Sequence, residues 1–343
     1  MNFFDNSFAS AAESINDFGK RGEPFIFIFD FLCREPVVSR IDEAAHNNIF
    51  FDFHGFSNCA RRKESHALIT SLDVYPPLYD EYVQSFSEVY KGLYEGNSYL
   101  CNLTFPTRLG TELTLEQIFS NARAKYCLLV KNRFTAFSPE TFVKINPEGI
   151  ISTFPMKGTI RGDTPDAAAK LLSDEKERAE HNTIVDLMRN DLAMVSTDVR
   201  VDSFRYLEKI ETNAGGLFQT SSQITGKLNT AWKENIGAII CSMLPAGSVT
   251  GAPKKSTVDI ILRAEPYERG FYTGVCGVFD GNSLDSAVLI RYVRQSMDGL
   301  YYHSGGGITV YSDPRSEYNE LIDKVYLPAA NFTKHPAVVL HFS

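Results

Sequence analysis

The sequence predicts an α+β fold in which antiparallel β-sheets pack face to face with helices outside. Strand-like runs cluster without the regular alternation of strand and helix that builds parallel βαβ units. Short turns such as Asp280-Gly281-Asn282 join neighbouring runs, which is typical of antiparallel hairpins. At least four helix patterns lie between these clusters.

The predicted strands are runs rich in β-branched and aromatic residues. They span 25–32, 48–54, 126–131, 142–145, 149–153, 271–279, 286–292 and 299–303. The longest uninterrupted apolar run is Phe25–Phe29. It reads as a buried strand, because a membrane-spanning helix needs about 20 apolar residues.

Helices are predicted from apolar positions at helical spacing and from their boundary residues. They span 77–95, 165–190, 252–264 and 314–327. Thr164 and Asp313 are the expected N-caps of the second and the fourth helix, with Pro165 and Pro314 at the first helical position. No low-complexity linker interrupts the chain, so residues 1–343 are expected to form a single compact, two-lobed domain.

Composition excludes several classes of function. The formal net charge of −8 argues against nucleic acid as the main ligand, because phosphate binding needs a basic surface. The six cysteines form neither a CxxC pair nor a zinc spacing, which favours free thiols in a reducing compartment. No secretory signal pattern opens the chain. We therefore expect a cytoplasmic protein that does not bind a membrane.

The segment Phe154–Arg161 is the most informative stretch. It places Lys157 between a proline turn and the pair Gly158-Thr159. Because glycine lets a ligand approach the backbone closely, Lys157 is a candidate nucleophile or anion clamp. A surface lysine where a strand ends in a turn explains the segment equally well.

Carboxylates are the second candidate group. Glu140 follows Ser138-Pro139 between two strand-like runs and is a candidate general acid or base. Two glutamate pairs, one on each of two predicted helices, have a spacing of three residues that puts each pair on one helix face. They are Glu177 with Glu180 and Glu317 with Glu320. Together they suggest a Mg²⁺ site, whereas the alternative is ordinary exposed glutamates in surface ion pairs.

Glycine-rich segments complete the set. The loop Ala246–Lys254 contains Ser248 and leads into a helix, and Gly305-Gly306-Gly307 follows a strand, so both suit an anion. Arg291, in an otherwise apolar run, is a candidate carboxylate partner. Neither loop matches the P-loop or GxGxxG spacing, so ATP and NAD are not supported. The residues alone thus describe a site for a small polyanion with Mg²⁺, a lysine and a carboxylic acid.

Taken together, these segments resemble the chorismate-utilising enzymes, which include anthranilate synthase component I, isochorismate synthase and aminodeoxychorismate synthase component I. The resemblance covers residues 90–330, leaves a divergent, shortened part at 1–75, and implies the fold of anthranilate synthase component I. The matching segments are Tyr99–Thr104, Ser138–Glu140, Pro155–Thr159, Lys176–Asn182, Ile184–Asp191, Ala246–Lys254, Arg291, Gly305–Gly307 and Glu317–Lys324.

Lysine at position 157 resembles the aminodeoxychorismate synthase branch, since the other branches have alanine there. Leu100 stands near where isochorismate synthases carry a lysine. The implied activity is replacement of the 4-hydroxyl group of chorismate by an amino group, on the way to 4-aminobenzoate and folate. Lys157 would add to the ring as a neutral amine, which needs a lowered lysine pKa, and Glu140 would be the general acid and base.

The resemblance also implies ligand contacts and partners. Mg²⁺ would be held by Glu180 and Glu320, with Glu177 and Glu317 in support. The substrate contacts would come from Thr159, Ser248, Arg291, Gly305, Gly306 and Gly307. The chain shows no Gly-x-Cys-x-Gly elbow, so ammonia is expected free or from a separate glutamine amidotransferase subunit.

Two positions depart from the family pattern. Gln219 stands where many relatives have a histidine linked to aromatisation, and Val278 stands where a tyrosine helps to bind a carboxylate. The alternatives are anthranilate or isochorismate formation and, from another class, a non-catalytic regulatory subunit that binds an amidotransferase. The intact Lys157, Glu140 and glutamate pairs weigh against the last.

Overall fold

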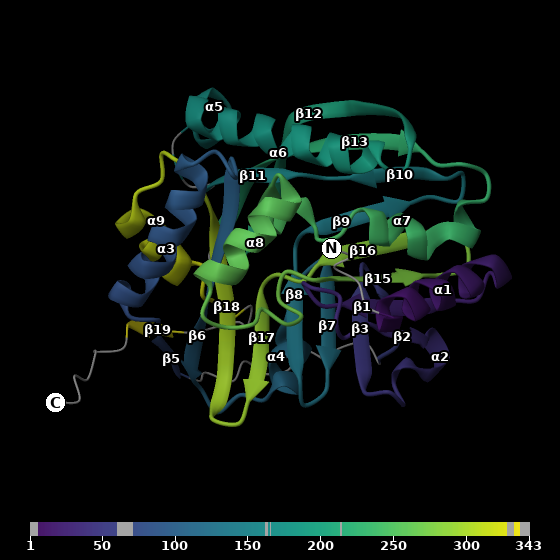
Figure 1. Cartoon of the computed structure of the whole chain (residues 1–343). Coiled ribbons are helices and arrows are strands. Elements are labelled where there is room, and N and C mark those ends of the chain that lie inside the picture. The colour runs from purple at the N-terminus through teal and green to yellow at the C-terminus, as the bar shows by residue number, and fades with distance from the viewer. Residues whose placement is uncertain are drawn as a thin grey trace. The chain divides into compact units, whose positions relative to one another are not determined.

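The structure is a computed structural model that describes residues 6–59, 71–161, 164, 166–212, 215–327 and 333–336 (Figure 1). The chain divides into two units, each assembled from three separate segments. Unit 1 comprises Met1–Ile41, Glu140–Ser248 and Thr273–Val288. Unit 2 comprises Asp42–Pro139, Val249–Tyr272 and Leu289–Ser343. Each unit has its own sheet.

The sheet of unit 1 is antiparallel, with strand order β11-β13-β10-β9-β16-β15-β1-β2, and β12 pairs with β13. Its strands are β1 (Phe25–Phe29), β2 (Val37–Arg40), β9 (Thr141–Ile145), β10 (Ile150–Thr153), β11 (Met156–Arg161), β12 (Thr197–Thr212), β13 (Gly215–Lys227), β15 (Val275–Phe279) and β16 (Leu284–Val288). The five residues of β1 are fully buried, and Phe8 packs edge-on against Phe29 at 5.0 Å between ring centroids.

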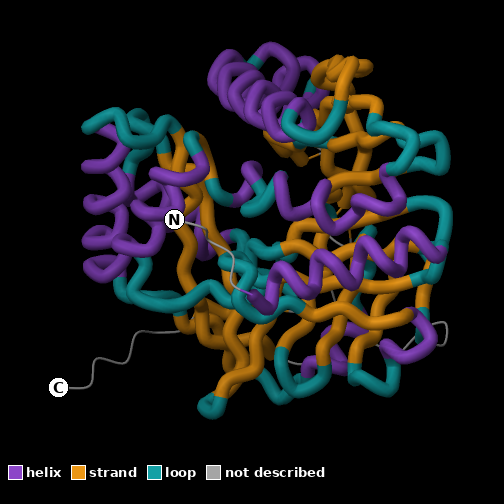
Figure 2. Tube along the Cα trace, turned by 45° about the vertical axis from the view of Figure 1, so that its right-hand side comes forward, coloured by secondary structure: helices purple, strands orange, loops and turns teal. Residues whose placement is uncertain are grey.

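The helices of unit 1 are α1 (Asn6–Arg21), α5 (Ala167–Ser173), α6 (Glu175–Ala193) and α7 (Ile236–Ser242), with the short 3₁₀ turns η1 (Trp232–Asn235) and η2 (Gly247–Val249). Helix α6 contacts β11, β12 and β13, and it lies along these strands in Figures 1 and 2. This contact brings the glutamates of α6 next to the strand that carries Lys157.

The sheet of unit 2 has strand order β19-β5-β6-β18-β17-β8-β7-β3-β4, and β14 pairs with β6. Its pairs are antiparallel except β19 with β5, which are parallel. The strands are β3 (Ile49–Phe53), β4 (Phe56–Ser57), β5 (Ser71–Tyr75), β6 (Leu100–Gly110), β7 (Tyr126–Val130), β8 (Phe134–Ser138), β14 (Gly251–Ala252), β17 (Tyr292–Ser296), β18 (Gly299–Ile308) and β19 (Thr333–Pro336).

The helices of unit 2 include α2 (Ile41–Ala44), which begins at the boundary, and α3 (Tyr79–Tyr94), α4 (Leu115–Asn121), α8 (Lys254–Ala264) and α9 (Pro314–Asp323). Asp313 caps α9 by accepting a hydrogen bond from the N–H of Ser316, with Pro314 at the first helical position, as the sequence predicted. None of the helices in the described residues is long and apolar enough to cross a membrane.

The predicted fold class is confirmed, but several boundaries were wrong. The helix expected at 165–190 is two helices, because the side chain of Asp174 accepts from the N–H of Glu177 and starts α6 anew. Pro165, its expected first residue, lies outside the described residues. The expected strand 286–292 is also two elements, since β16 ends at Val288 and β17 begins at Tyr292 in the other sheet. The expected strand 271–279 begins only at Val275.

Candidate active site

Lys157, Glu177 and Glu180 lie together in unit 1, and we call them the lysine cluster. Lys157 is in β11, where the pairing with β13 shifts register between Lys157 and Thr159. Gly158 occupies this irregularity with φ of +74°, a conformation that favours glycine. The glutamates lie three residues apart on α6, so one face of the helix carries both.

Lys157 and Glu180 form an ion pair. Their Nζ and Oε2 atoms are 3.4 Å apart, and their side chains are 31% and 34% exposed. The pair is therefore open to a ligand and partly shielded from water. Glu177 lies close to Gly158, because a Cβ atom built on this glycine would stand 3.0 Å from Oε2 of Glu177. The hydroxyl of Thr220 in β13 donates to the backbone carbonyl of Lys157 and fixes the strand there.

Unit 1 contains three further candidates, Thr159, Glu140 and Ser248. Thr159 is in β11 opposite Gln219, the residue at the family's histidine position, and the side chain of Thr159 lies outside the described residues. Glu140 joins β8 to β9, and its Oε1 accepts a short hydrogen bond from the hydroxyl of Ser248 in η2. A carboxyl group bonded to a hydroxyl is arranged for proton transfer.

The glycine cluster of unit 2 comprises Gly305, Gly306, Glu317, Glu320 and Lys324. The sequence placed the glycines in a loop after a strand, whereas they are part of β18 and pair with β6. Close packing explains the correction, because a Cβ atom on Gly305 would stand 2.5 Å from the carbonyl oxygen of residue 103. Gly307 pairs with Asn102 in the same ladder.

Helix α9 brings carboxylates to these glycines. A Cβ atom on Gly306 would stand 3.3 Å from Oε2 of Glu317 and 3.9 Å from Oε1 of Glu320. Lys324 Nζ lies 2.6 Å from Oε1 of Glu320 and donates to the carbonyl of Gly305 at 2.8 Å. The predicted spacing on one helix face is thus observed, together with a lysine partner for Glu320.

Arg291 was predicted within a strand, but it lies just before β17 with φ of +53°. Its carbonyl accepts from the N–H of Phe137, and its guanidinium lies 5.0 Å from the ring centroid of Tyr326. Among the described residues no partner bonds its buried Nε atom. A buried donor without a partner is costly, so Arg291 is suited to receive an anion.

The donor chemistry of the two clusters fits Mg²⁺. Each cluster offers two carboxylates on one helix face, and Mg²⁺ prefers oxygen ligands and retains several waters. No group of three or more His, Cys, Asp or Glu side chains arranged to hold a metal is found in the part of the chain that the structure describes. The residues present would suit Mg²⁺ that is held by a few carboxylates and completed by water and by oxygens of the substrate.

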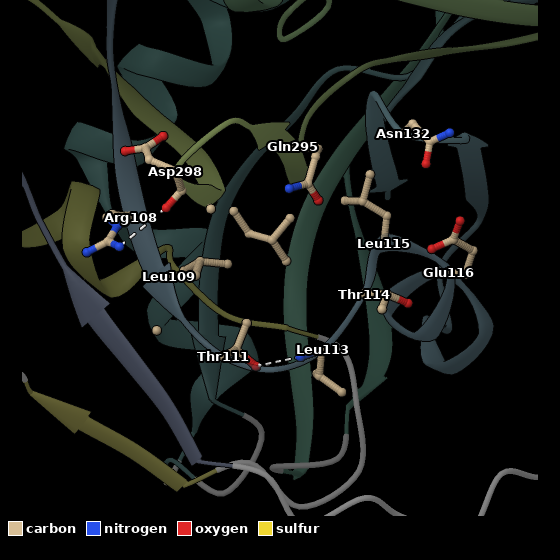
Figure 3. Close-up of a pocket in the computed structure, with 13 residues that line it drawn as sticks. Arg108, Leu109, Thr111, Leu113, Thr114, Leu115, Glu116, Asn132, Gln295 and Asp298 are labelled. Carbon is tan, nitrogen blue, oxygen red and sulfur yellow. Dashed lines mark hydrogen bonds between the residues drawn. The ribbon is translucent and has the colours of Figure 1, made fainter.

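Unit 2 contains a cavity. It measures about 490 Å³, and its lining includes the apolar residues Leu109, Leu113 and Leu300. Charged lining residues include Arg108 and Glu116 (Figure 3). None of the predicted site residues lines it. A cavity of this size suits a small ligand, but it has no connection to the candidate site, because no candidate residue contributes to its lining.

Buried polar residues were missed by the sequence reasoning. His181 in α6 is fully buried, and burial lowers its pKa to about 4, helped by the charges of Arg205 and Lys157. Glu265 and Arg269 form an ion pair of side chains that are each 2% exposed. The spacing of four residues between Glu265 and Arg269 was the available signal, but burial of charge is not visible in spacing.

The sequence is similar to known proteins over most of its length. The pattern of the family described as chorismate binding enzyme matches residues 54–329. A protein of Haemophilus influenzae named "Uncharacterized PabA-like protein" is 47% identical over 316 residues, or 92% of this chain and 95% of its own length. The aminodeoxychorismate synthase component 1 of Klebsiella aerogenes is 32% identical over 262 residues, or 72% of this chain and 56% of its own length.

Among solved structures, anthranilate synthase component I from Streptococcus pneumoniae is similar, with a TM-score of 0.63 and 27% identity. The similarity covers 76% of this chain and 60% of that one. The matched region contains the lysine cluster, Arg291 and the glycine cluster. This chain belongs to the family of chorismate binding enzymes.

Proposed function

We propose that this protein aminates chorismate at C4 to form 4-amino-4-deoxychorismate, the reaction of an aminodeoxychorismate synthase component I. The observation that carries the proposal is the contact of Lys157 with Glu180 in a partly buried part of a β-strand. Glu180 holds the Lys157 side chain in place, and the proposal is that this amine adds to the ring of chorismate. The identity with the Klebsiella aerogenes enzyme supports the same branch.

The reaction would proceed through two displacements. Lys157 is paired with Glu180 as an ammonium, so it must first lose a proton to solvent. Its neutral Nζ would then add to C2 of the ring, the double bond would shift, and the C4–O bond would break as Glu140 protonates the departing hydroxyl, which leaves as water. Ammonia then adds to C4 and the C2–N bond to lysine breaks. Glu140 finally takes a proton from the new ammonium group, which restores both side chains. The net change is chorismate plus ammonia to aminodeoxychorismate plus water.

The remaining residues would bind and orient the substrate. Arg291 offers a buried Nε donor to a carboxylate, and Ser248 holds the carboxyl group of Glu140 through its hydroxyl. Thr159 and the β18 glycines are proposed substrate contacts. Mg²⁺, when bound by Glu180 and Glu320 with Glu177 and Glu317, would neutralise a substrate carboxylate.

The proposed source of ammonia is a separate glutamine amidotransferase subunit acting in the cytoplasm, on the route to 4-aminobenzoate and folate. Anthranilate or isochorismate formation is the principal alternative, and a non-catalytic regulatory subunit is the alternative of another class. Product identity separates all three.

The test is mass-spectrometric product analysis of the purified chain with chorismate, Mg²⁺ and ammonium at mildly alkaline pH. We expect aminodeoxychorismate from the wild type and its loss in Lys157→Ala. Lys170→Ala is the matched control, because Lys170 is an exposed lysine of α5 in the same unit, and it should leave the yield unchanged. Anthranilate or isochorismate from the wild type would overturn the proposal.

A second measurement addresses the order of events. Intact-protein mass spectrometry of acid-quenched turnover mixtures should detect wild-type protein carrying the substrate minus water, and Lys157→Ala should lack this species. Glu140→Gln should lower kcat by about 10²- to 10⁴-fold, the usual loss for a general acid. Product without any covalent species under rapid quench would exclude the nucleophilic role.

A further inference from the structure

His181 lies next to the lysine cluster without being part of it. It follows Glu180 in α6, and its side chain is fully buried. Its Nε2 atom is 2.6 Å from the hydroxyl oxygen of Ser222 in β13. This contact ties helix α6 directly to strand β13.

Ser222 makes two more hydrogen bonds besides the one to His181. Its hydroxyl oxygen also accepts from the backbone N–H of Arg205 in β12 at 2.9 Å. Its own N–H donates to the carbonyl of Pro155 at 3.0 Å, two residues before Lys157. The ring of His181 is therefore linked, through a single serine, to the stretch of chain that positions Lys157.

Arg205 links this hydrogen-bond network to α5. Its guanidinium donates to the carbonyls of Leu171 at 2.9 Å and Leu172 at 3.0 Å, at the end of α5. A methyl group of Leu171 would lie 2.9 Å from a Cβ atom on Gly158, so α5 packs directly on the irregular part of β11. Arg205 adopts φ of +47°, a strained conformation for a non-glycine residue that persists only where its surroundings enforce it.

The chemistry of the bond is defined by its partners. The Ser222 hydroxyl, which already accepts from Arg205, can either donate to Nε2 of His181 or accept a second hydrogen bond from it, depending on the imidazole tautomer. An apolar residue of the same size would fill the space but would leave that hydroxyl without its imidazole partner. The hydrogen bond, rather than the volume of the ring, distinguishes histidine here.

We propose that His181 is a positioning residue that, through Ser222, holds α6 in the register that keeps Glu180 on Lys157. The inference deepens the proposed function, since it concerns the same lysine, and it predicts which substitutions release the lysine. His181→Leu and Ser222→Ala each break the connection. His181→Gln restores an amide donor and acceptor near the Nε2 position and is the conservative rescue.

The test follows the lysine itself and does not depend on turnover. Wild type and variants are treated with an amine-acylating reagent in metal-free buffer, and the acylation rate of each lysine is read by peptide mass spectrometry. Glu180→Gln supplies the reference for an unpaired Lys157, and Lys170 is the internal control. A carboxylate in contact protects an amine, so Glu180→Gln should raise the Lys157 rate by about two- to fivefold.

The inference expects His181→Leu and Ser222→Ala to match Glu180→Gln at Lys157, His181→Gln to match the wild type, and Lys170 to stay constant throughout. Wild-type rates at Lys157 in both folded variants would overturn it, because the histidine would then only fill space. Ser222→Ala removes one hydroxyl and keeps the test decisive if His181→Leu fails to fold. If the proposed function is wrong, the wild type will form a different product while the acylation rates still follow the expected pattern.

Discussion

Breaking the buried ion pair of unit 2 should cost more stability than a typical single substitution. The Glu265 carboxylate accepts from Arg269 at 2.8 and 2.7 Å and from the N–H and hydroxyl of Thr104, both at 2.9 Å. Arg269 also donates to the carbonyls of Val249 at 3.1 Å and Asn102 at 2.5 Å. The side chains of Glu265 and Arg269 are each only 2% exposed, so the ion pair lies almost entirely out of contact with water.

Arg269→Met leaves the Glu265 charge buried without its counter-ion. Burial alone would lower the pKa of Arg269, and the charge of Glu265 outweighs it and raises the pKa above its usual value, so the arginine is firmly charged. Removing one partner of such a pair costs about 3–5 kcal/mol of the free energy of unfolding. Two carbonyls also lose their donor, which keeps the loss in the upper part of that range.

The assay is urea unfolding followed by far-UV circular dichroism, with hydrogen exchange over β6 and β14. Trp232, the one tryptophan, lies in unit 1, and its fluorescence follows that unit separately. The double variant Glu265→Leu/Arg269→Met removes both charges, so it should lose at least about 1 kcal/mol less than the sum of the single losses. A single loss below about 1 kcal/mol, or additive losses, would refute the account of the buried pair.

Three further predictions concern strained or buried positions. Gly251→Ala should prevent folding of unit 2, because the φ of Gly251 is +123° and a Cβ atom there would stand 1.8 Å from the carbonyl oxygen of Leu100. Gly55→Ala is the control: Gly55 also has positive φ but has open space around it, so this change should lower the melting temperature by only a few degrees. Burial lowers the His303 pKa to about 3, so the unfolded state takes up its proton first and stability falls as pH drops from about 6.5. Between pH 6.5 and 4.5 that loss is about 2.3 kcal/mol, because the unfolded histidine is already half protonated at pH 6.5 and the full slope of 1.36 kcal/mol per pH unit is reached only below it. His303→Phe should show a correspondingly flatter pH profile in urea titrations. Gly158→Ala should weaken Mg²⁺ binding in calorimetry with chorismate present, since the new methyl group would stand 3.0 Å from a carboxylate oxygen of the lysine cluster; unchanged affinity would contradict that placement.

The parts of the fold that depend on local pattern were predictable. The apolar run at 25–29 became a fully buried strand, and the Asp313-Pro314 boundary became a capped helix start. Errors occurred where tertiary pairing overrides local preference. The glycines at 305–307 were predicted as a loop, but their pairing with β6 makes them part of a strand. The run at 286–292 was predicted as one strand, but it contributes to a strand in each of the two sheets.

The candidate site shows the same division. The helical spacing of Glu177 and Glu180 placed both on one face, whereas nothing local to Lys157 indicated its contact with Glu180, 23 residues away in the sequence. Resemblance to a family supplied the grouping that spacing could not. His181 and Arg269 were missed because a buried polar residue is recognised by its partners, and those partners are distant in the sequence.

The way each unit is assembled from three separate segments has a consequence for synthesis of the chain. β1 emerges from the ribosome among the first 30 residues, but its partner β15 begins only at Val275. β6 likewise waits for β18, which begins at Gly299. Both sheets thus remain incomplete until the last fifth of the chain is made, and pairing over such separations is slow. β2 follows β1 closely and can pair with one edge of Phe25–Phe29, whereas the other edge has no partner until β15 is made. An apolar strand with an unpaired edge is prone to aggregation, so this order of synthesis favours help from chaperones.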